Sequence, residues 1–173
     1  MSREEKEAMS SPLYFDIDMD MYSSGSHKFG RISWRSERAC IGDFDVTVLL
    51  GSLELALDDL IRRLSGEQIE FVGNYECESV FLALNTAVWD GNVDDLSSLA
   101  GIKCDVLDAR NCLAVPTGIE SFDGEAAFIY KGESGYFFSW RDWVSKAIEC
   151  APIEKSDFLS RLVISLNKIR AFK

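Results

Sequence analysis

A strict alternation of apolar and polar residues opens the patterned part of the chain. Apolar side chains occupy every second position of residues 13–21, and the positions between them carry Tyr or Asp. A period of two is typical of a β-strand with one buried and one exposed face. The Ser/Gly-rich residues 23–26 separate it from a second alternating run at 28–36, which predicts an antiparallel hairpin. A short apolar run at 39–41 predicts a third strand, so the chain begins with a three-stranded meander.

The period then changes to a helical one. Leucine and isoleucine recur at the spacing of one helical face: Leu50, Leu53, Leu57, Leu60, Ile61 and Leu64. This stripe predicts an amphipathic helix that ends at Ser65 and Gly66. Because such a stripe needs an apolar surface to cover, we expect it to pack on the inner face of the meander, which carries Phe15, Ile17 and Met19.

The middle of the chain has a weaker pattern. Residues 68–72 predict a strand and residues 93–100 a short helix, whereas residues 77–89 fit a helix or a strand. Further on, apolar runs at 125–130 and 136–140 flank a glycine-containing loop. They predict a second hairpin.

Two helices are predicted after this hairpin. Residues 143–150 predict a short helix that ends before Pro152, because proline cannot continue a helix. A longer helix is predicted from Ser156, a good N-cap residue. Lys168 and Arg170 near its end complement the helix dipole.

These elements predict an α+β fold: a mostly antiparallel sheet, made of an N-terminal meander and a C-terminal hairpin, with helices packed on one face. The lack of regular strand and helix alternation argues against a doubly wound parallel sheet. A length of 173 residues and a hydrophobic content of 47% fit one packed core. We expect a flexible leader over residues 1–10 and a single domain over residues 11–173.

The cysteines indicate the compartment. Five cysteines are scattered along the chain without a Cys-x-x-Cys pair, and there is one histidine, which argues against a zinc or disulfide framework. The N-terminal residues lack the apolar stretch of a signal peptide, and no apolar run reaches the roughly 18 residues of a membrane span. We therefore expect free thiols in a cytoplasmic protein, and no metal or other cofactor.

The sharpest catalytic candidate is the pair Asp16 and Asp18, because two aspartates two positions apart can supply a nucleophile and an acid beside Mg²⁺. The pair resembles the first motif of haloacid-dehalogenase-type phosphatases. Residues 19–21 depart from that family's small-residue turn, and the strand alternation continues through them. His27 lies in a Ser/Gly turn without a recognisable nucleophile motif. We therefore expect a solvated strand face and no enzyme.

The acidic excess is concentrated in the middle of the chain. The net charge is −11, and residues 67–125 contain 12 acidic and 2 basic residues, a net charge of −10. Such a field favours a basic protein partner over nucleic acid or an anionic membrane, which are bound through Lys and Arg. The alternative is a set of solvated loops that only keep the chain soluble. The predicted partner-binding residues are Glu67, Glu70, Glu76, Glu78, Trp89, Asp90, Asp94, Asp95, Asp105 and Asp108.

Trp140 and Trp143 flank Arg141 and Asp142. Tryptophan and arginine dominate protein-binding hot spots. Their position at the end of a predicted strand favours the core for both tryptophans.

Residues 29–34, Phe-Gly-Arg-Ile-Ser-Trp, are followed by residues 41–43, Ile-Gly-Asp, and by the helix of residues 50–64. With the acidity and the late aromatic hairpin, this arrangement resembles the immunity proteins of bacterial polymorphic toxin systems, in particular those paired with contact-dependent growth inhibition toxins. The resemblance implies tight neutralisation of a toxin domain, often a nuclease, in the producing cell. It transfers no site residue.

Protection of that kind requires nanomolar or tighter binding, about −12 kcal/mol. Because a nuclease is basic where it binds nucleic acid, an acidic inhibitor can occupy its active site or substrate channel, and an exosite fits equally well. The alternatives are an acidic adaptor unrelated to toxins and a metal-dependent phosphatase that uses Asp16 and Asp18. The sequence determines neither the toxin nor the oligomeric state.

Overall fold

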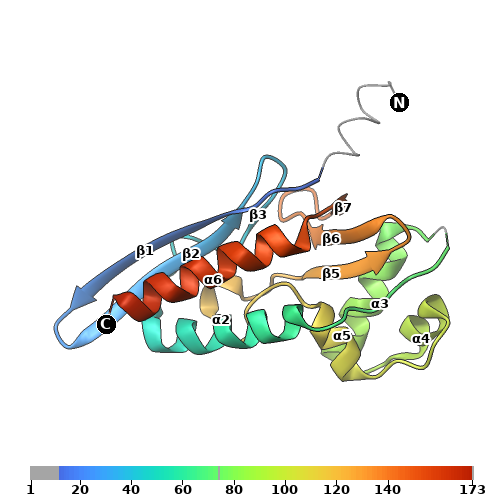
Figure 1. The fold of residues 1–173 in the computed structure, drawn as a ribbon, viewed down its shortest axis with the longest axis horizontal. Coiled ribbons are helices and arrows are strands. Elements are labelled where there is room, and N and C mark those ends of the chain that lie inside the picture. The colour runs from blue at the N-terminus through green and yellow to red at the C-terminus, as the bar shows by residue number, and fades with distance from the viewer. Residues whose placement is uncertain (1–11, 74, 173) are drawn as a thin grey trace.

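The computed structural model describes residues 12–73 and 75–172 (Figure 1). The leader predicted over residues 1–10 lies outside the described residues. Two antiparallel sheets, of four and three strands, combine with helices, which confirms the predicted α+β class. Among the helices of the described residues, none is long and apolar enough to cross a membrane.

The first sheet is the predicted meander with one additional short strand. β1 (Asp16–Ser24) and β2 (His27–Arg35) pair antiparallel over their full length. Gly25 in their turn has a φ of 60°, which glycine adopts without a steric penalty. β3 (Cys40–Ile41) and β4 (Val48–Leu49) both pair with β2. β2 is therefore the central strand of this sheet and β1 lies at an edge.

Two long helices pack against this sheet (Figure 1). α2 (Leu50–Ser65) buries the predicted leucine stripe, which confirms that helix and its end. α6 (Lys155–Ala171) lies beside α2 and also contacts β1. The prediction that Ser156 caps α6 is wrong, because the N-cap position is occupied by Glu154, whose side chain makes no capping hydrogen bond.

The second sheet contains the predicted C-terminal hairpin. β5 (Ala127–Gly132) and β6 (Gly135–Arg141) pair antiparallel around a tight turn. β7 (Ile148–Pro152) pairs with the other side of β6. The meander and the hairpin thus occur as two sheets of the one fold.

The prediction of a helix over residues 143–150 is wrong. The Asp142 carboxylate accepts hydrogen bonds from the N–H group (2.6 Å) and the hydroxyl (2.7 Å) of Ser145, and Lys146 has a φ of 61°. These features turn the chain back, so that the following residues pair with β6. Pro152 ends a strand and is tolerated there because β7 lies at the edge of the sheet.

Residues 68–72 lie extended beside β5 but form a single bridge where a strand was predicted. The Phe71 N–H donates to the carbonyl oxygen of Lys131 (2.8 Å), and the Lys131 N–H donates to that of Ile69 (3.0 Å). This parallel pairing places the chain next to the second sheet just before it enters the middle segment.

The middle segment folds into three helices that lie together at one end of the molecule (Figure 1). Residues 77–89, which fitted either element, form α3 (Cys77–Asp90). α4 (Asp94–Ala100) was predicted, whereas α5 (Val106–Cys112) was not. We call α3, α4 and α5, with the chain that connects them, the helical end. The short 3-10 helix η1 (Glu120–Phe122) then leads back to β5.

One continuous apolar core joins the two sheets. Phe15 directly precedes β1 of the first sheet, and Phe138 lies in β6 of the second. Their ring centroids are 4.6 Å apart, and the ring centroid of Phe158 of α6 lies 5.7 Å from that of Phe15. A parallel bridge between Leu13 and Ile153 adds a backbone link. The helical end is therefore held on a core shared by both sheets and α6.

Candidate functional site

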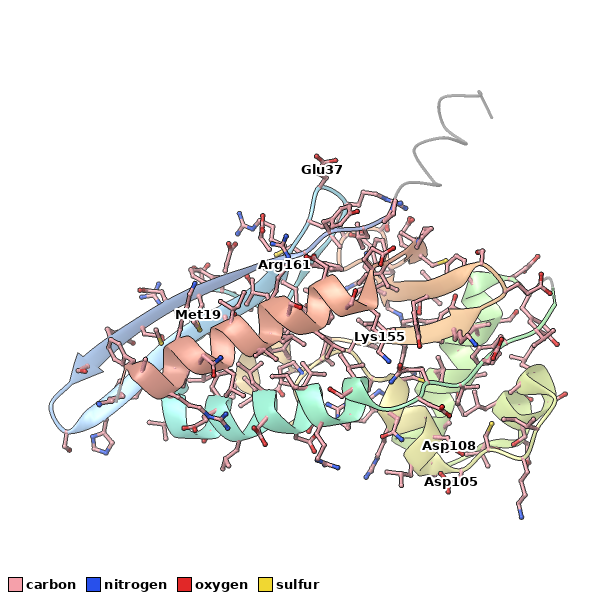
Figure 2. The ribbon with its side chains drawn as sticks, viewed as in Figure 1. Met19, Glu37, Asp105, Asp108, Lys155 and Arg161 are labelled. Atoms are coloured by element: carbon pink, nitrogen blue, oxygen red, sulfur yellow. The ribbon has the colours of Figure 1, made fainter. Side chains whose placement is uncertain are left out.

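The helical end carries most of the predicted partner-binding residues. Nine of the ten are exposed, and Asp108 is half-buried. Figure 2 shows Asp105 and Asp108 at the margin of the molecule that lies away from Glu37. Seven of the twelve acidic residues of residues 67–125 thus lie at the helical end, whereas Glu120, Asp123 and Glu125 lie at η1 and the chain after it. The predicted residues on α3, α4, α5 and their caps are Glu76, Glu78, Trp89, Asp90, Asp94, Asp95, Asp105 and Asp108, while Glu67 and Glu70 lie on the chain that leads there.

Asp105 and Asp108 also form the start of α5. The Asp108 N–H donates to the Asp105 carboxylate (2.9 Å), and the Asp105 N–H donates to the Asp108 carboxylate (2.8 Å). This reciprocal capping box satisfies two N–H groups that a helix start leaves unpaired. The Asp-x-x-Asp spacing is the sequence signal that could have identified α5.

Other acidic residues differ in how their charge is compensated. Glu70 forms an ion pair with Lys131 (2.8 Å), with both side chains about half exposed, which is worth roughly 0–1 kcal/mol. Asp94 and Asp95 lie in the first turn of α4, where the helix dipole favours negative charge. Both are exposed, so their charge remains available to a partner.

Trp89 is a large exposed aromatic residue of the helical end. Its side chain is 58% exposed, although it follows the buried Val88 near the end of α3. Two surface cavities, of about 420 Å³ and about 370 Å³, meet at Trp89 and share Thr117. An exposed tryptophan beside recesses is typical of a protein-binding hot spot, because it offers a large rigid apolar surface.

Arginines from three elements surround Trp89. Arg62 of α2 and Arg110 of α5 line one cavity, and Arg141 of β6 lines the other. Leu107 of α5 adds an apolar side chain that is 62% exposed. We call Trp89, Thr117, Leu107 and these arginines the Trp89 surface. The same two cavities are also lined by Asp59, Asp123 and Glu125, so basic and acidic side chains are mixed at this surface.

Trp89 was predicted as a partner-binding residue, whereas the three arginines were not. They lie in α2, α5 and β6, far apart in the sequence. A net charge summed over one segment of the chain does not count arginines from other segments. Folding places those arginines beside Trp89. Tryptophan and arginine are the residue types most enriched at hot spots, so the missed arginines change the expected chemistry of the surface.

Arg63 lies beneath the Trp89 surface and is buried. Its guanidinium donates hydrogen bonds to the carbonyl oxygens of Arg110 (3.0 Å), Leu113 (2.6 Å) and Val115 (3.2 Å), and to the Asp59 carboxylate (2.8 Å). Burial raises the pKa of Asp59, but hydrogen bonds and charge from the neighbouring arginines outweigh it, so the pKa is lowered overall. Arg63 thereby fastens α2 to α5 and to the chain that follows α5.

Asp16 and Asp18, the alternative catalytic pair, are used in ion pairs. Asp16 pairs with Arg161 of α6 (2.6 Å), and Asp18 pairs with Arg35 of β2 (2.9 Å). Both lie on the face of β1 opposite to its partly buried apolar side chains, at the beginning of a strand that continues to Ser24. The phosphatase motif places its aspartates where a strand ends, and this arrangement differs from it.

Trp140 and Trp143 differ in how deeply they are buried. The predicted core position is confirmed for Trp140, which is 2% exposed, and is wrong for Trp143, which is 52% exposed. The buried carboxylate of Glu125 accepts a hydrogen bond from the Gly42 N–H (2.9 Å), and Glu125 and Trp143 line the same surface cavity. Burial raises the pKa of Glu125 and outweighs the lowering effects of the Gly42 N–H and of Trp143.

Replacement of Glu125 by glutamine is expected to remove a pH dependence of stability. A carboxyl whose pKa is raised on folding contributes stability that is fully present below its ordinary value of 4.5 and is lost as the pH rises through the folded pKa. The wild-type free energy of unfolding should therefore fall relative to that of Glu125→Gln as the pH rises above 4.5, by at most about 1.4 kcal/mol per pH unit.

Urea unfolding at several pH values between about 4.5 and 7.5 measures this difference. Glu120→Gln is the matched control, because Glu120 is a nearby exposed glutamate, and its variant should follow the wild-type curve. A constant difference between wild type and Glu125→Gln across this range would contradict the prediction.

Within residues 12–73 and 75–172, no group of three or more His, Cys, Asp and Glu side chains could hold a metal ion. His27 is exposed at the start of β2, with Nδ1 at 3.4 Å from the Ser26 hydroxyl. No protein family, curated protein or solved structure matches this chain. The chemistry of the helical end and of the Trp89 surface is therefore the basis for assigning a function.

Proposed function

We propose that this protein is an immunity protein that binds and neutralises a toxin domain through its helical end. The observation that carries the proposal is Trp89, which is 58% exposed, adjoins two cavities and lies in the segment with a net charge of −10. A hydrophobic anchor within an acidic field is the combination that a tight inhibitor of a basic protein needs.

The two parts of this surface have different roles in binding. The acidic residues steer a basic partner and raise the association rate by about 10- to 1,000-fold at low salt. The Trp89 surface slows dissociation, because a buried tryptophan in a hot spot contributes about 2 kcal/mol or more. Nanomolar affinity, about −12 kcal/mol, needs both effects over an interface of roughly 1,600 Å².

The partner's chemistry follows from this arrangement. Lys and Arg of a nuclease that normally contact phosphate would face the acidic residues, so binding blocks the active site or substrate channel. Arg110 and Arg141 would face carboxylates or backbone carbonyls next to an apolar recess that receives Trp89. The toxin-domain partner therefore has a basic channel with an acidic and apolar margin.

The direct test is rescue from a toxin. If the gene immediately upstream encodes the C-terminal end of a large exported protein, that C-terminal domain is expressed in cells with and without this chain. Survival only in the presence of this chain, with a nanomolar complex of the two purified proteins, is the expected result. Tight binding without rescue would favour an acidic adaptor, and no binding and no rescue would reject the proposal.

Two variants should separate anchoring from steering. Trp89→Ala is expected to weaken the affinity by about 30-fold or more, mainly through faster dissociation. Asp94→Lys with Asp95→Lys is expected to slow association about tenfold at low salt and much less at high salt. Stopped-flow association and dissociation rates across salt concentrations measure both effects.

Matched controls lie outside the helical end. Tyr14→Ala removes an aromatic side chain of similar exposure, 55%, and Asp20→Lys with Glu37→Lys makes the same change in net charge at exposed positions. Both controls should bind as the wild type does. Equal losses in the controls and in the helical-end variants would show that the partner binds elsewhere.

A further inference from the structure

Two cysteines far apart in the sequence meet beside a tyrosine. Cys77 is the first residue of α3 and Cys150 lies in β7, and these two elements pack against each other. The Tyr130 hydroxyl donates to the Cys150 sulfur (3.9 Å), and Cys77, Tyr130 and Cys150 line the same surface cavity. Cys150 therefore accepts a hydrogen bond from Tyr130 at a cavity that it shares with Cys77.

Tyr130 is held in this position by aromatic packing. Its ring stacks on Phe137 of β6 at 5.9 Å between centroids and meets Phe71 edge-on at 5.5 Å. Because Tyr130 and Cys150 lie on β5 and β7, which both flank β6, the sheet sets the distance between the hydroxyl and the sulfur. The arrangement is built by the fold and does not depend on a flexible loop.

A cavity gives small molecules access to both sulfurs. Cys77, Tyr130 and Cys150 all line a surface cavity of about 250 Å³, several times the roughly 30 Å³ that one water molecule occupies in the liquid. Both cysteines are half-buried. A reagent of the size of hydrogen peroxide can therefore reach them, whereas a protein thiol cannot enter as easily.

We propose that Cys150 and Cys77 form a peroxide-reactive dithiol site, in which Cys150 is the attacking thiolate and Cys77 is the thiol that resolves it to a disulfide. This site is separate from the Trp89 surface and does not depend on the function proposed above.

The surroundings favour a negative charge on Cys150. Its pKa is lowered to about 7, first by the hydrogen bond from Cys77 and further by the Tyr130 hydroxyl and the charge of Arg38, against the opposing effects of burial and Glu149. The pKa values of Cys77 and Tyr130 are raised, so both remain protonated donors. Because the thiolate is the reactive form, Cys150 is the nucleophile of the pair at neutral pH.

The reaction balances with hydrogen peroxide as the oxidant. The Cys150 thiolate attacks one peroxide oxygen, so that an S–O bond forms, the O–O bond breaks and hydroxide leaves, which takes a proton from solvent to become water. Cys77 then loses its proton and attacks the Cys150 sulfur. The S–S bond forms, the S–O bond breaks, and the departing oxygen leaves with that proton as a second water. Two thiols are oxidised and one peroxide is reduced.

The other cysteines differ from this pair. Burial raises the pKa of Cys112 to about 12 and also raises that of Cys104. Cys40 is exposed, and its thiol lies at 4.0 Å from the carbonyl oxygen of Gly42. Cys40 is therefore the accessible reference thiol, and Cys104 and Cys112 are expected to stay reduced.

The test is oxidation of the full chain with hydrogen peroxide at neutral pH, followed by non-reducing peptide mapping. The expected product contains an intramolecular Cys77–Cys150 disulfide, with two of the five thiols lost and both restored by dithiothreitol. The Cys40→Ser variant should give the same product without interchain dimers. Oxidation of Cys40 while Cys77 and Cys150 remain thiols would overturn the proposal.

Two substitutions at one position separate the resolving role from the hydrogen bond. Cys77→Ser keeps a donor beside Cys150 but cannot form a disulfide, so a sulfenic acid should accumulate on Cys150 and react with dimedone. Cys77→Ala also removes the donor, so the pKa of Cys150, followed by thiolate absorbance, should rise and peroxide oxidation at neutral pH should slow by about threefold or more. Equal rates in the two variants, or dimedone labelling of neither, would contradict the assigned roles.

Discussion

Replacement of Arg63 by alanine is expected to destabilise the protein by about 3–5 kcal/mol. The buried guanidinium donates to the carbonyl oxygens of Arg110, Leu113 and Val115 and to Asp59. Alanine leaves these acceptors without their donor in a site that water enters poorly, and each unsatisfied buried group costs about 1–3 kcal/mol. Since a domain of this size is stable by about 5–15 kcal/mol in total, the loss is a large share.

Urea unfolding at neutral pH measures the Arg63 effect. Arg62→Ala is the matched control, because Arg62 pairs with the same Asp59 but its side chain is 74% exposed. The control should cost less than about 1 kcal/mol, as exposed ion pairs do. Equal effects of the two variants would show that the carbonyl contacts of Arg63 contribute nothing beyond its charge.

Replacement of Trp34 by alanine is expected to destabilise the protein by about 3–5 kcal/mol. Trp34 is fully buried, packs against Phe122 and Phe158 at centroid distances of 4.8 and 6.1 Å, and donates its indole N–H to the Ala114 carbonyl oxygen (3.2 Å). Alanine creates a cavity where the first sheet, η1 and α6 meet, and it leaves a buried carbonyl without its donor.

The comparison of two tryptophans makes this prediction specific. Trp89→Ala removes the same side chain from a site that is 58% exposed and should change the free energy of unfolding by about 0.5 kcal/mol or less. The two variants should therefore affect different properties. Trp34→Ala should lower the stability of the fold, and Trp89→Ala should weaken partner binding. Similar losses of stability in both would mean that Trp89 is packed as a core residue.

Elements with a strong local period were predicted well. The alternation of residues 13–21 and the leucine stripe of residues 50–64 correspond to β1 and α2, because a period of two or of 3.6 directly reports which face of a strand or helix is buried. The late hairpin was also predicted. Elements without a clear period were predicted less well. The short helix α5 was missed, and its capping box was a better signal than its periodicity.

The error over residues 143–150 has a tertiary cause. These residues contain apolar positions that fit one turn of a helix, but β6 offers an unpaired strand edge, and the Asp142 turn directs the chain to it. Pairing with an existing edge satisfies the backbone groups of β7 in a way that a short isolated helix does not. Local helix propensity does not show that pairing with β6 is available as an alternative to a helix.

The sequence by itself determined the α+β class, the long elements and the acidity of residues 67–125, because these depend on local periodicity and composition. Only the tertiary structure decided which residues meet. It buried Arg63 among carbonyls and placed Trp89 between two cavities with arginines from α2, α5 and β6. It also brought Cys77 next to Cys150. Such contacts join segments that are far apart in the sequence. The sequence pattern within each segment does not show which other segments it packs against.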